Sequence, residues 1–381
     1  MTGQAATPSR RPVRVLQVLT SDAVAGIELL IASLSERLHG TSMRITVAML
    51  APPGPIAERL RSGGIKTHSL GGSGLAVAAI RLASLLRTGN FDVVNAHGFK
   101  STMLVRVLAR ALAPRTAVVC SVHGLHVTEV EDVSGAKARA VLALDRVSSS
   151  LVDLYDVNTQ GGVRFLTSSG FDAKRLRYTP NAIDVRSWPL TAASRSAEGA
   201  PLILCVARFV KRKRQETLIR ALELLRRQRI EFRAILAGAG PTLAENRALV
   251  ESLGLSSAVE LPGAVTPAEV KRLMREADVF CLPSLWEGTV LCILEAMASG
   301  VPVVGTAVNG IDELVVDGRT GFLVPPEQPA ALAESISKIL ADPQLGQTFA
   351  LAGRRRVEEL FDLDAAAAAR KELYLNVLTR A

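Results

Sequence analysis

Glu287-Gly-Thr-Val-Leu-Cys-Ile-Leu-Glu295 lies between two short apolar runs, Asp278-Val-Phe-Cys-Leu-Pro283 and Val301-Pro-Val-Val304. The two runs are rich in apolar and β-branched residues and predict buried strands, whereas the stretch between them predicts the first turns of a helix. A strand, a helix and a further strand in this order form one unit of a parallel sheet. This stretch therefore predicts an α/β fold.

Two carboxylates mark the ends of the stretch. Glu287 and Glu295 are eight residues apart, so on a helix both side chains would project on a similar face. Glu287 would stand at the helix entry beside Gly288, where unpaired backbone N–H groups bind anions. The pair suits the hydroxyl groups of a nucleotide sugar. The alternatives are a carboxylate that caps the helix at Glu287 and a surface helix residue at Glu295.

The same alternation of strands and helices runs through the chain. It predicts helices such as 28–38, 77–86 and 101–112 in the first half and 214–229, 267–277 and 330–341 in the second. The strands are expected at 14–19, 44–50, 92–96, 117–122 and 153–158, and then at 202–206, 233–237, 259–261, 279–282, 301–305 and 321–324. Two such series predict two doubly wound, Rossmann-like domains with parallel sheets, whose ligands bind beyond the carboxyl ends of the strands.

The domain boundary is expected between Trp188 and Ala200, where the chain is small, polar and without period. We expect a disordered tail over 1–12, a first domain over 13–188 and a second over 189–360. No apolar run approaches the length of about 18 residues that crosses a bilayer, and the scattered cysteines are typical of a reducing cytoplasm. The sequence therefore favours a cytoplasmic protein.

The charge is distributed unevenly. Residues 1–190 contain 22 Lys and Arg against 13 Asp and Glu, whereas the remainder holds 23 of each. A basic first half favours an acidic partner, such as an anionic membrane surface or an acidic acceptor. An arginine-rich composition is the alternative explanation. Nucleic acid is not expected, because aromatic residues are few and no binding signature is present.

Cationic and glycine-rich loops follow the first strands of the second half. Arg208 and Lys213 come after strand 202–206 and could clamp a diphosphate, whose developing charge they would stabilise; a solvated basic loop is the alternative. Gly238 follows strand 233–237 in Ala-Gly-Ala-Gly-Pro241. It would let backbone amides approach a phosphate or base, or would simply form a tight turn.

The first half supplies two further candidates at strand ends. Gly26 opens the helix after the first strand, and His123 follows strand 117–122. A histidine there can donate to a phosphate or a hydroxyl, although a satisfied core histidine is the alternative. No cluster of His, Cys, Asp or Glu has metal-ligand spacing, so neither a metal nor another cofactor is expected.

Taken together, the motifs resemble the retaining glycosyltransferases of family four, which have the GT-B fold, over nearly the whole chain. The resemblance runs through Gly26, His123-Gly124, Asn181 to Asp184, Arg208 and Lys213, Glu287-x7-Glu295, Ala296-Met-Ala-Ser-Gly-Val-Pro-Val-Val304 and Gly318-x-x-Gly321. It implies two domains facing across a cleft, with the acceptor on the first, the nucleotide on the second, and final helices (361–381) that cross back onto the first domain.

The resemblance also implies roles for single residues. Arg208 and Lys213 would bind the diphosphate, Glu287 and His123 would flank the donor sugar, and Glu295 would hold the ribose. The backbone of Gly288, Thr289, Val290 and Leu291 would lie along the sugar and phosphate. The expected reaction is metal-independent, retaining transfer from a UDP- or GDP-sugar to a hydroxyl of a lipid-linked, lipopolysaccharide or other cell-envelope glycan. A GT-B sugar-nucleotide epimerase and a catalytically silent nucleotide-sugar-binding protein are the alternatives.

Overall fold

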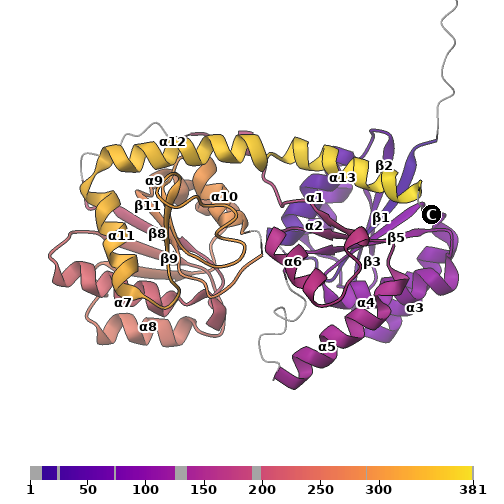
Figure 1. The fold of residues 1–381 in the computed structure, drawn as a ribbon, viewed down its shortest axis with the longest axis horizontal. Helices are drawn as coiled ribbons and strands as arrows, with labels where there is room; N and C mark the ends of the chain where they lie inside the picture. Colours follow the sequence, from indigo (N-terminus) through magenta and orange to yellow (C-terminus); the bar gives the residue numbers. More distant parts are fainter. Residues whose placement is uncertain are drawn as a thin grey trace, which may run out of the picture.

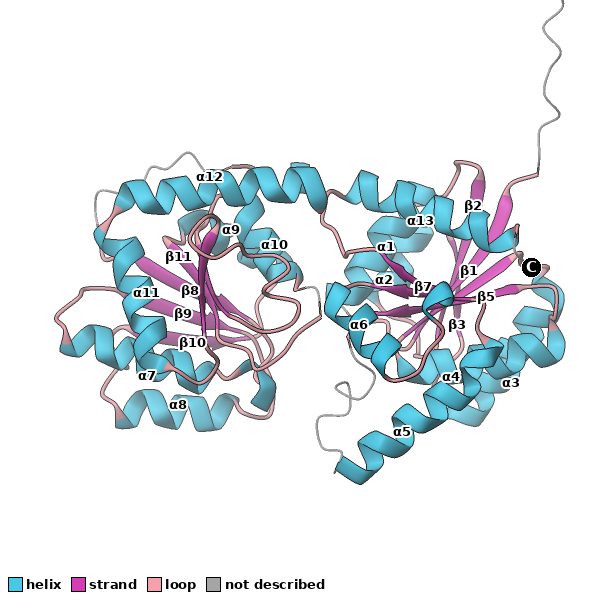
Figure 2. Ribbon diagram, viewed as in Figure 1, coloured by secondary structure: helices cyan, strands magenta, loops and turns pink. Residues whose placement is uncertain are grey.

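The computed structural model describes residues 11–23, 26–72, 74–124, 135–190, 199–288 and 290–379. Strands and helices alternate along it (Figure 2), and the strands form two parallel sheets, as expected. The described part of the chain begins at Arg11, which belongs to the tail predicted over 1–12. The Arg11 guanidinium pairs there with the carboxylate of Asp92 at 2.8 Å. No helix in the described ranges is long and apolar enough to span a membrane.

The first sheet has the strand order β3-β2-β1-β4-β5-β6-β7. One face packs on α1, α2 and the distant α13, and the other face packs on α3, α4 and α6. The strands are β1 (Val13–Leu19), β2 (Met43–Met49), β3 (Lys66–Ser69), β4 (Val93–His97), β5 (Ala117–Val122), β6 (Leu154–Val157) and β7 (Leu176–Tyr178). The helices are α1 (Gly26–Leu38), α2 (Pro55–Ser62), α3 (Leu75–Gly89), α4 (Phe99–Leu112), α5 (Gly135–Val147) and α6 (Gln160–Ser168).

The second sheet has the order β10-β9-β8-β11-β12-β13, and helices on both faces complete one continuous apolar core. Its strands are β8 (Leu202–Val206), β9 (Arg233–Ala237), β10 (Val259–Gly263), β11 (Val279–Leu282), β12 (Val303–Thr306) and β13 (Gly321–Val324). Its helices are α7 (Gln215–Arg227), α8 (Leu243–Ser252), α9 (Pro267–Glu276), α10 (Leu291–Ala298), α11 (Pro329–Ala341) and α12 (Pro343–Leu360).

The chain crosses between the domains twice, and the two crossings are bonded to each other. The second leads into α13 (Leu363–Leu378), which continues from α12 and lies on the first domain (Figure 1). At the crossing, Ile183 N donates to Phe361 O and Leu363 N donates to Ile183 O, both at 3.0 Å.

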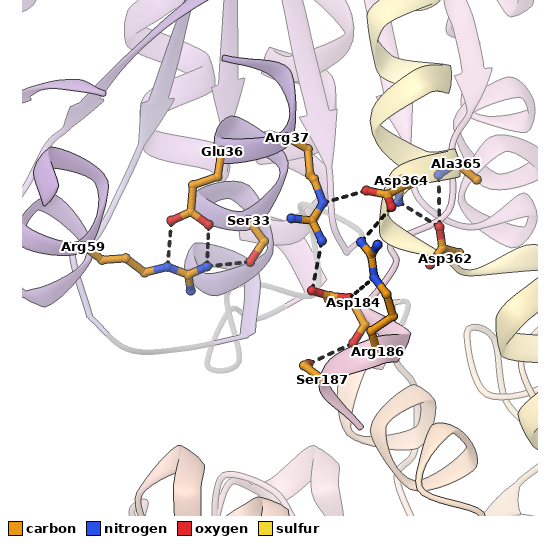
Figure 3. A network of polar contacts seen from close by, with 10 residues as sticks. All are labelled: Ser33, Glu36, Arg37, Arg59, Asp184, Arg186, Ser187, Asp362, Asp364 and Ala365. Carbon is orange, nitrogen blue, oxygen red and sulfur yellow. Dashed lines mark hydrogen bonds and ion pairs between the residues drawn. The ribbon is translucent and has the colours of Figure 1, made fainter. Parts of the chain in front are cut away.

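Charged side chains reinforce this junction (Figure 3). The Arg37 guanidinium on α1 pairs with Asp184 at 2.9 Å and with Asp364 at 2.6 Å, and Arg186 also reaches Asp364, at 2.8 Å. Asp362 caps α13 by accepting bonds from the amides of residues 364 and 365. The crossings are therefore tied to α1 as well as to each other.

The strand predictions missed β3, and the helices named as examples did not include α2, α5, α6, α8 and α12. Strand β3 is the short edge strand Lys-Thr-His-Ser, which is partly exposed and carries no run of apolar residues. Helix α6 contains two glycines, Gly161 and Gly162, which lower helix propensity. These two elements thus lack the local signal on which the predictions depend.

Candidate active site

The cationic loop follows β8, and its two predicted cations differ in environment. Arg208 is exposed, and its carbonyl accepts a bond from Nε2 of Gln215 at 2.8 Å. Among the described residues, no carboxylate forms an ion pair with the Arg208 guanidinium. Lys213 ends a short 3-10 helix (Lys211–Lys213) and is only 8% exposed. Of the two predicted cations, Arg208 is thus accessible and Lys213 is buried.

Glu287 is the partner of the buried cation. Lys213 Nζ donates to Glu287 Oε1, and Glu287 is itself 8% exposed. The side-chain amide of Asn309 also donates to the backbone carbonyl of Glu287, at 3.2 Å. The expectation that Glu287 and Glu295 share a helical face is wrong, because α10 begins only at Leu291. A buried charge must be paired, and Glu287 therefore turns toward Lys213 from the loop that precedes the helix.

Glu295 lies on α10 and is partly buried. Burial raises the pKa of its carboxyl to about 7, because desolvation disfavours the ionised form, and the positive charge of Lys271 acts in the opposite direction. Glu295 thus titrates near neutral pH. Its predicted contact with a ribose stays a prediction.

The two domains meet at the predicted glycines. A Cβ added to Gly288 would lie 2.0 Å from the backbone oxygen of His123, and one added to Gly26 would lie 3.3 Å from Leu291 Cδ1. Leu291 packs against the cores of both domains. The structure therefore brings His123 and Gly26 of the first domain against Gly288 and Leu291 of the second.

Packing explains two further predicted positions, Gly238 and Val290. Gly238 has a φ of 143°, and a Cβ there would lie 1.9 Å from the carbonyl oxygen of Ala207. Close approach of the β8 and β9 loops thus suffices to require a glycine, and its contact with a donor remains a prediction. Val290 is the buried N-cap residue of α10, and Thr289 lies outside the described residues.

His123 is buried and joins a polar cluster that the sequence analysis missed. Its Nε2 lies 2.9 Å from His97 Nδ1, and His97 Nε2 lies 2.7 Å from Gln17 Oε1. Tyr374 of α13 accepts from Gln17 Nε2 at 2.9 Å and from Asn95 Nδ2 at 2.8 Å. The available signal was a polar residue at alternate positions near the ends of apolar strands, as in Val-Leu-Gln-Val-Leu19.

Metal ligands do not gather within the described ranges, where no group of three or more His, Cys, Asp and Glu side chains could hold an ion. The cysteines are equally unsuited to nucleophilic chemistry. Burial raises the pKa of Cys205 to about 12 and that of Cys120 to about 11. Both groups therefore remain thiols at neutral pH, and a thiol is a much weaker nucleophile than a thiolate.

Comparison with known proteins identifies the family of the chain. The family described as Glycosyltransferase Family 4 matches residues 24–187, and Glycosyl transferases group 1 matches residues 188–356. A glycogen synthase of Mycobacterium tuberculosis is 32% identical over 80% of this chain and 74% of its own length. WcaL of Salmonella typhimurium, named for colanic acid biosynthesis, is 36% identical, but the match covers 45% of this chain and 44% of that protein.

The fold has solved counterparts. Anabaena HepE, whose structure holds UDP and glucose, superposes with a TM-score of 0.83 at 21% identity, over 96% of this chain and all of that one. The two glycosyltransferase family models match consecutive halves of the chain, and the match to the glycogen synthase spans both domains. The chain therefore belongs to the family-four glycosyltransferases and has the GT-B fold.

Proposed function

We propose that this protein is a retaining, metal-independent glycosyltransferase that moves a sugar from a UDP- or GDP-sugar to a hydroxyl of a cell-envelope glycan. The observation that carries the proposal is the buried Lys213–Glu287 pair, which lies in loops at the strand ends beside the contact between Gly288 and His123. Arg208, on the same loop as Lys213, adds an accessible cation. Family membership and the UDP in the HepE structure support a nucleotide-sugar donor.

The chemistry requires stabilisation of a leaving diphosphate. Arg208 would bind its oxygens with a planar fork, and Lys213 would supply a point charge in a site of low dielectric, where the interaction is strong. The bond from the anomeric carbon to the diphosphate oxygen breaks, and a bond from the acceptor oxygen forms on the same face. The acceptor proton passes to the leaving phosphate, so no protein nucleophile is needed.

A screen of nucleotides and turnover assays test the proposal. UDP, GDP and their sugars are screened by thermal shift, since a ligand at about 100 times its Kd stabilises the fold by about 2.7 kcal/mol. Transfer from the binding donor should give a product of unchanged anomeric configuration by NMR, also after treatment with EDTA. Arg208→Ala should abolish turnover with the fold intact, whereas Lys338→Ala, an exposed cation on α11, should not. An inverted product or loss of activity in EDTA would overturn the corresponding part.

The same donor separates the two alternatives. A sugar-nucleotide epimerase would change the sugar without an acceptor, so the products formed from donor alone identify it. A silent binding protein would show the thermal shift without turnover. The retained cations and carboxylates (Arg208, Lys213, Glu287 and Glu295) favour the transferase.

The acceptor is proposed to be lipid-linked and the protein to dock on an anionic membrane surface. Helices α3, α4 and α5 lie next to one another on the first domain (Figure 1) and carry exposed apolar residues, Ile80, Val107 and Val147. Arginines on the same helices and the net charge of this half favour anionic lipid. The protein should float with phosphatidylglycerol vesicles at physiological salt, and Val147→Asp should weaken flotation. Failure to bind would refute docking but not transfer.

A further inference from the structure

The four central strands of the first sheet carry polar residues in a shared layer beneath α13. On the face that packs on α13, buried apolar residues precede buried polar residues in each strand, and β1 closes this face with Leu19. The apolar residues are Val15, Val93, Val119 and Leu154, and the polar ones are Gln17, Asn95, His97, Ser121, His123 and Asp156. Buried polar groups cost stability unless they bond to one another, and in this layer they form a connected set of hydrogen bonds.

The hydrogen bonds in the layer have a fixed direction. Asp156, paired with Arg370 of α13 at 3.3 Å, accepts from Ser121 Oγ at 3.0 Å. Asn95 Oδ1 lies 3.1 Å from Ser121 Oγ and could also accept its hydrogen, but the Asp156 carboxylate is the stronger acceptor. With that hydrogen on the Asp156 bond, Ser121 Oγ accepts from Asn95 Nδ2 at 3.0 Å. The same Asn95 amide nitrogen donates to the Tyr374 hydroxyl at 2.8 Å. The carboxylate thus sets the orientation of Asn95 and presents Tyr374 with a donor.

Gln17 extends this order to the histidines. Its Nε2 donates to Tyr374 at 2.9 Å, which leaves Oε1 to accept from His97 Nε2 at 2.7 Å. Burial, with the nearby His123 and Arg370, lowers the pKa of His97 well below its usual range, so His97 carries one proton. With that proton on Nε2, His97 Nδ1 is an acceptor for His123 Nε2 at 2.9 Å.

We propose that Gln17, His97 and Tyr374 are positioning residues that hold His123 with a proton fixed on Nε2, which makes Nδ1 the acceptor nitrogen of the ring. Through Tyr374, the helix that returns from the second domain sets the tautomer of a histidine beside Gly288. The inference rests on the proposed function for its role in turnover, but not for the tautomer itself. In this tautomer His123 accepts hydrogen bonds through Nδ1, as suits a sugar hydroxyl.

Nitrogen-15 NMR of the five histidines tests the tautomer directly, since two-bond couplings distinguish Nδ1–H from Nε2–H rings. We expect Nε2–H for His97 and His123 in the native protein, with slowly exchanging protons. Tyr374→Phe removes the acceptor of the Gln17 amide, so Gln17 can reverse and both rings should become tautomer mixtures. Turnover of the donor found in the thermal-shift screen should fall roughly tenfold in kcat, with KM for the donor nearly unchanged.

Tyr155→Phe is the matched control. Tyr155 is also a buried tyrosine of the first domain, but its hydroxyl bonds to no group in the described ranges. Its removal should leave the histidine spectra and kcat unchanged. Gln17→Met removes the amide that links Tyr374 to His97 and should give the same spectra as Tyr374→Phe. It replaces Tyr374→Phe as the test if that variant folds poorly.

An Nδ1–H tautomer for His123 in the native protein would overturn the proposal, as would native spectra in both Tyr374→Phe and Gln17→Met. If the native protein turns over no donor, the proposed function fails, and the spectra alone still decide the tautomer. If the spectra change as expected but kcat does not, the positioning role in turnover is refuted.

Discussion

Lys213 and Glu287 form an ion pair in which each residue exposes only 8% of its surface. They come from different loops, after β8 and β11, so the pair ties together the two strand ends beside which the sheet order reverses. Ligands of doubly wound domains bind at such a reversal. The pair therefore places a desolvated charge at the position where the fold admits a ligand.

Removing one member of this pair should destabilise the protein strongly. Lys213→Met leaves the Glu287 carboxylate buried without its partner, which typically costs about 3–5 kcal/mol. Urea unfolding should show this as a lower free energy of unfolding, and the double variant with Glu287→Gln should recover part of it. Lys338→Met, which breaks the exposed pair with Glu334 on α11, should not shift the midpoint. Equal midpoints for Lys213→Met and Lys338→Met would contradict the prediction.

Gly288→Ala should reduce activity more than stability. The added Cβ would lie 2.0 Å from the His123 backbone oxygen, a separation that no rotamer relieves, so the domains must move apart locally. We expect kcat/KM to fall by about 10²-fold, the effect typical of a misplacement of about 1 Å at a reacting site. Gly63→Ala, whose Cβ meets only ordinary contacts at 3.5 Å and beyond, should retain native kinetics. Native kinetics in Gly288→Ala would show that this contact does not matter to turnover.

The sequence predicted the parts of the fold that have a strong local signal. Both sheets and most central strands follow from apolar runs, because a strand buried on both faces is mostly apolar. β3 escaped prediction because an edge strand needs no such run, and α6 because its N-terminus is stabilised from outside. Gln160 N and Gly161 N of α6 each donate to the Glu313 carboxylate at 2.9 Å, a contact across the domains that no local pattern encodes.

The site was predictable as a set of strand-end residues but not as an arrangement. Spacing suggested a helical relation between Glu287 and Glu295, whereas the loop before α10 turns Glu287 toward Lys213. The pairing depends on burial, which spacing does not report. The polar cluster that ends at His123 draws its residues from four strands and from α13. Only the assembled sheet therefore brings Gln17 and Tyr374 together.

Glu295 should make stability depend on pH in a defined direction. A carboxyl whose folded pKa is raised to about 7 favours the neutral form, so its ionisation costs stability as pH rises from about 4.5, the unfolded value, through about 7. Glu295→Gln cannot ionise and should gain about 2 kcal/mol relative to the native protein at pH 8, but little at pH 5. Thermal unfolding at both pH values measures the difference. A gain at pH 5 of the same size as at pH 8 would contradict the assignment.

The same carboxyl should report nucleotide binding. If ribose hydroxyls donate to Glu295, they favour its ionised form, and UDP or GDP binding at pH 6.5 should release a fraction of a proton. Calorimetry in two buffers of different ionisation enthalpy measures that release. Glu295→Gln should bind more weakly and release none. Proton release that persists in the variant would assign it to another group.

Glu313 should hold the two domains together through the N-terminus of α6. Its carboxylate accepts from two helix amides of the other domain, and charge-assisted bonds of this kind are strengthened by the helix dipole. Glu313→Ala removes both bonds and about 1–3 kcal/mol of attraction between the domains, without touching the core of either. Small-angle scattering of the ligand-free variant should give a larger radius of gyration than the native protein, while Glu334→Ala, an exposed change within α11, should not. Because the lost attraction acts between the domains, a saturating nucleotide that contacts both domains should restore the native radius of gyration. A native radius of gyration in the ligand-free Glu313→Ala variant would show that Glu313 does not limit opening.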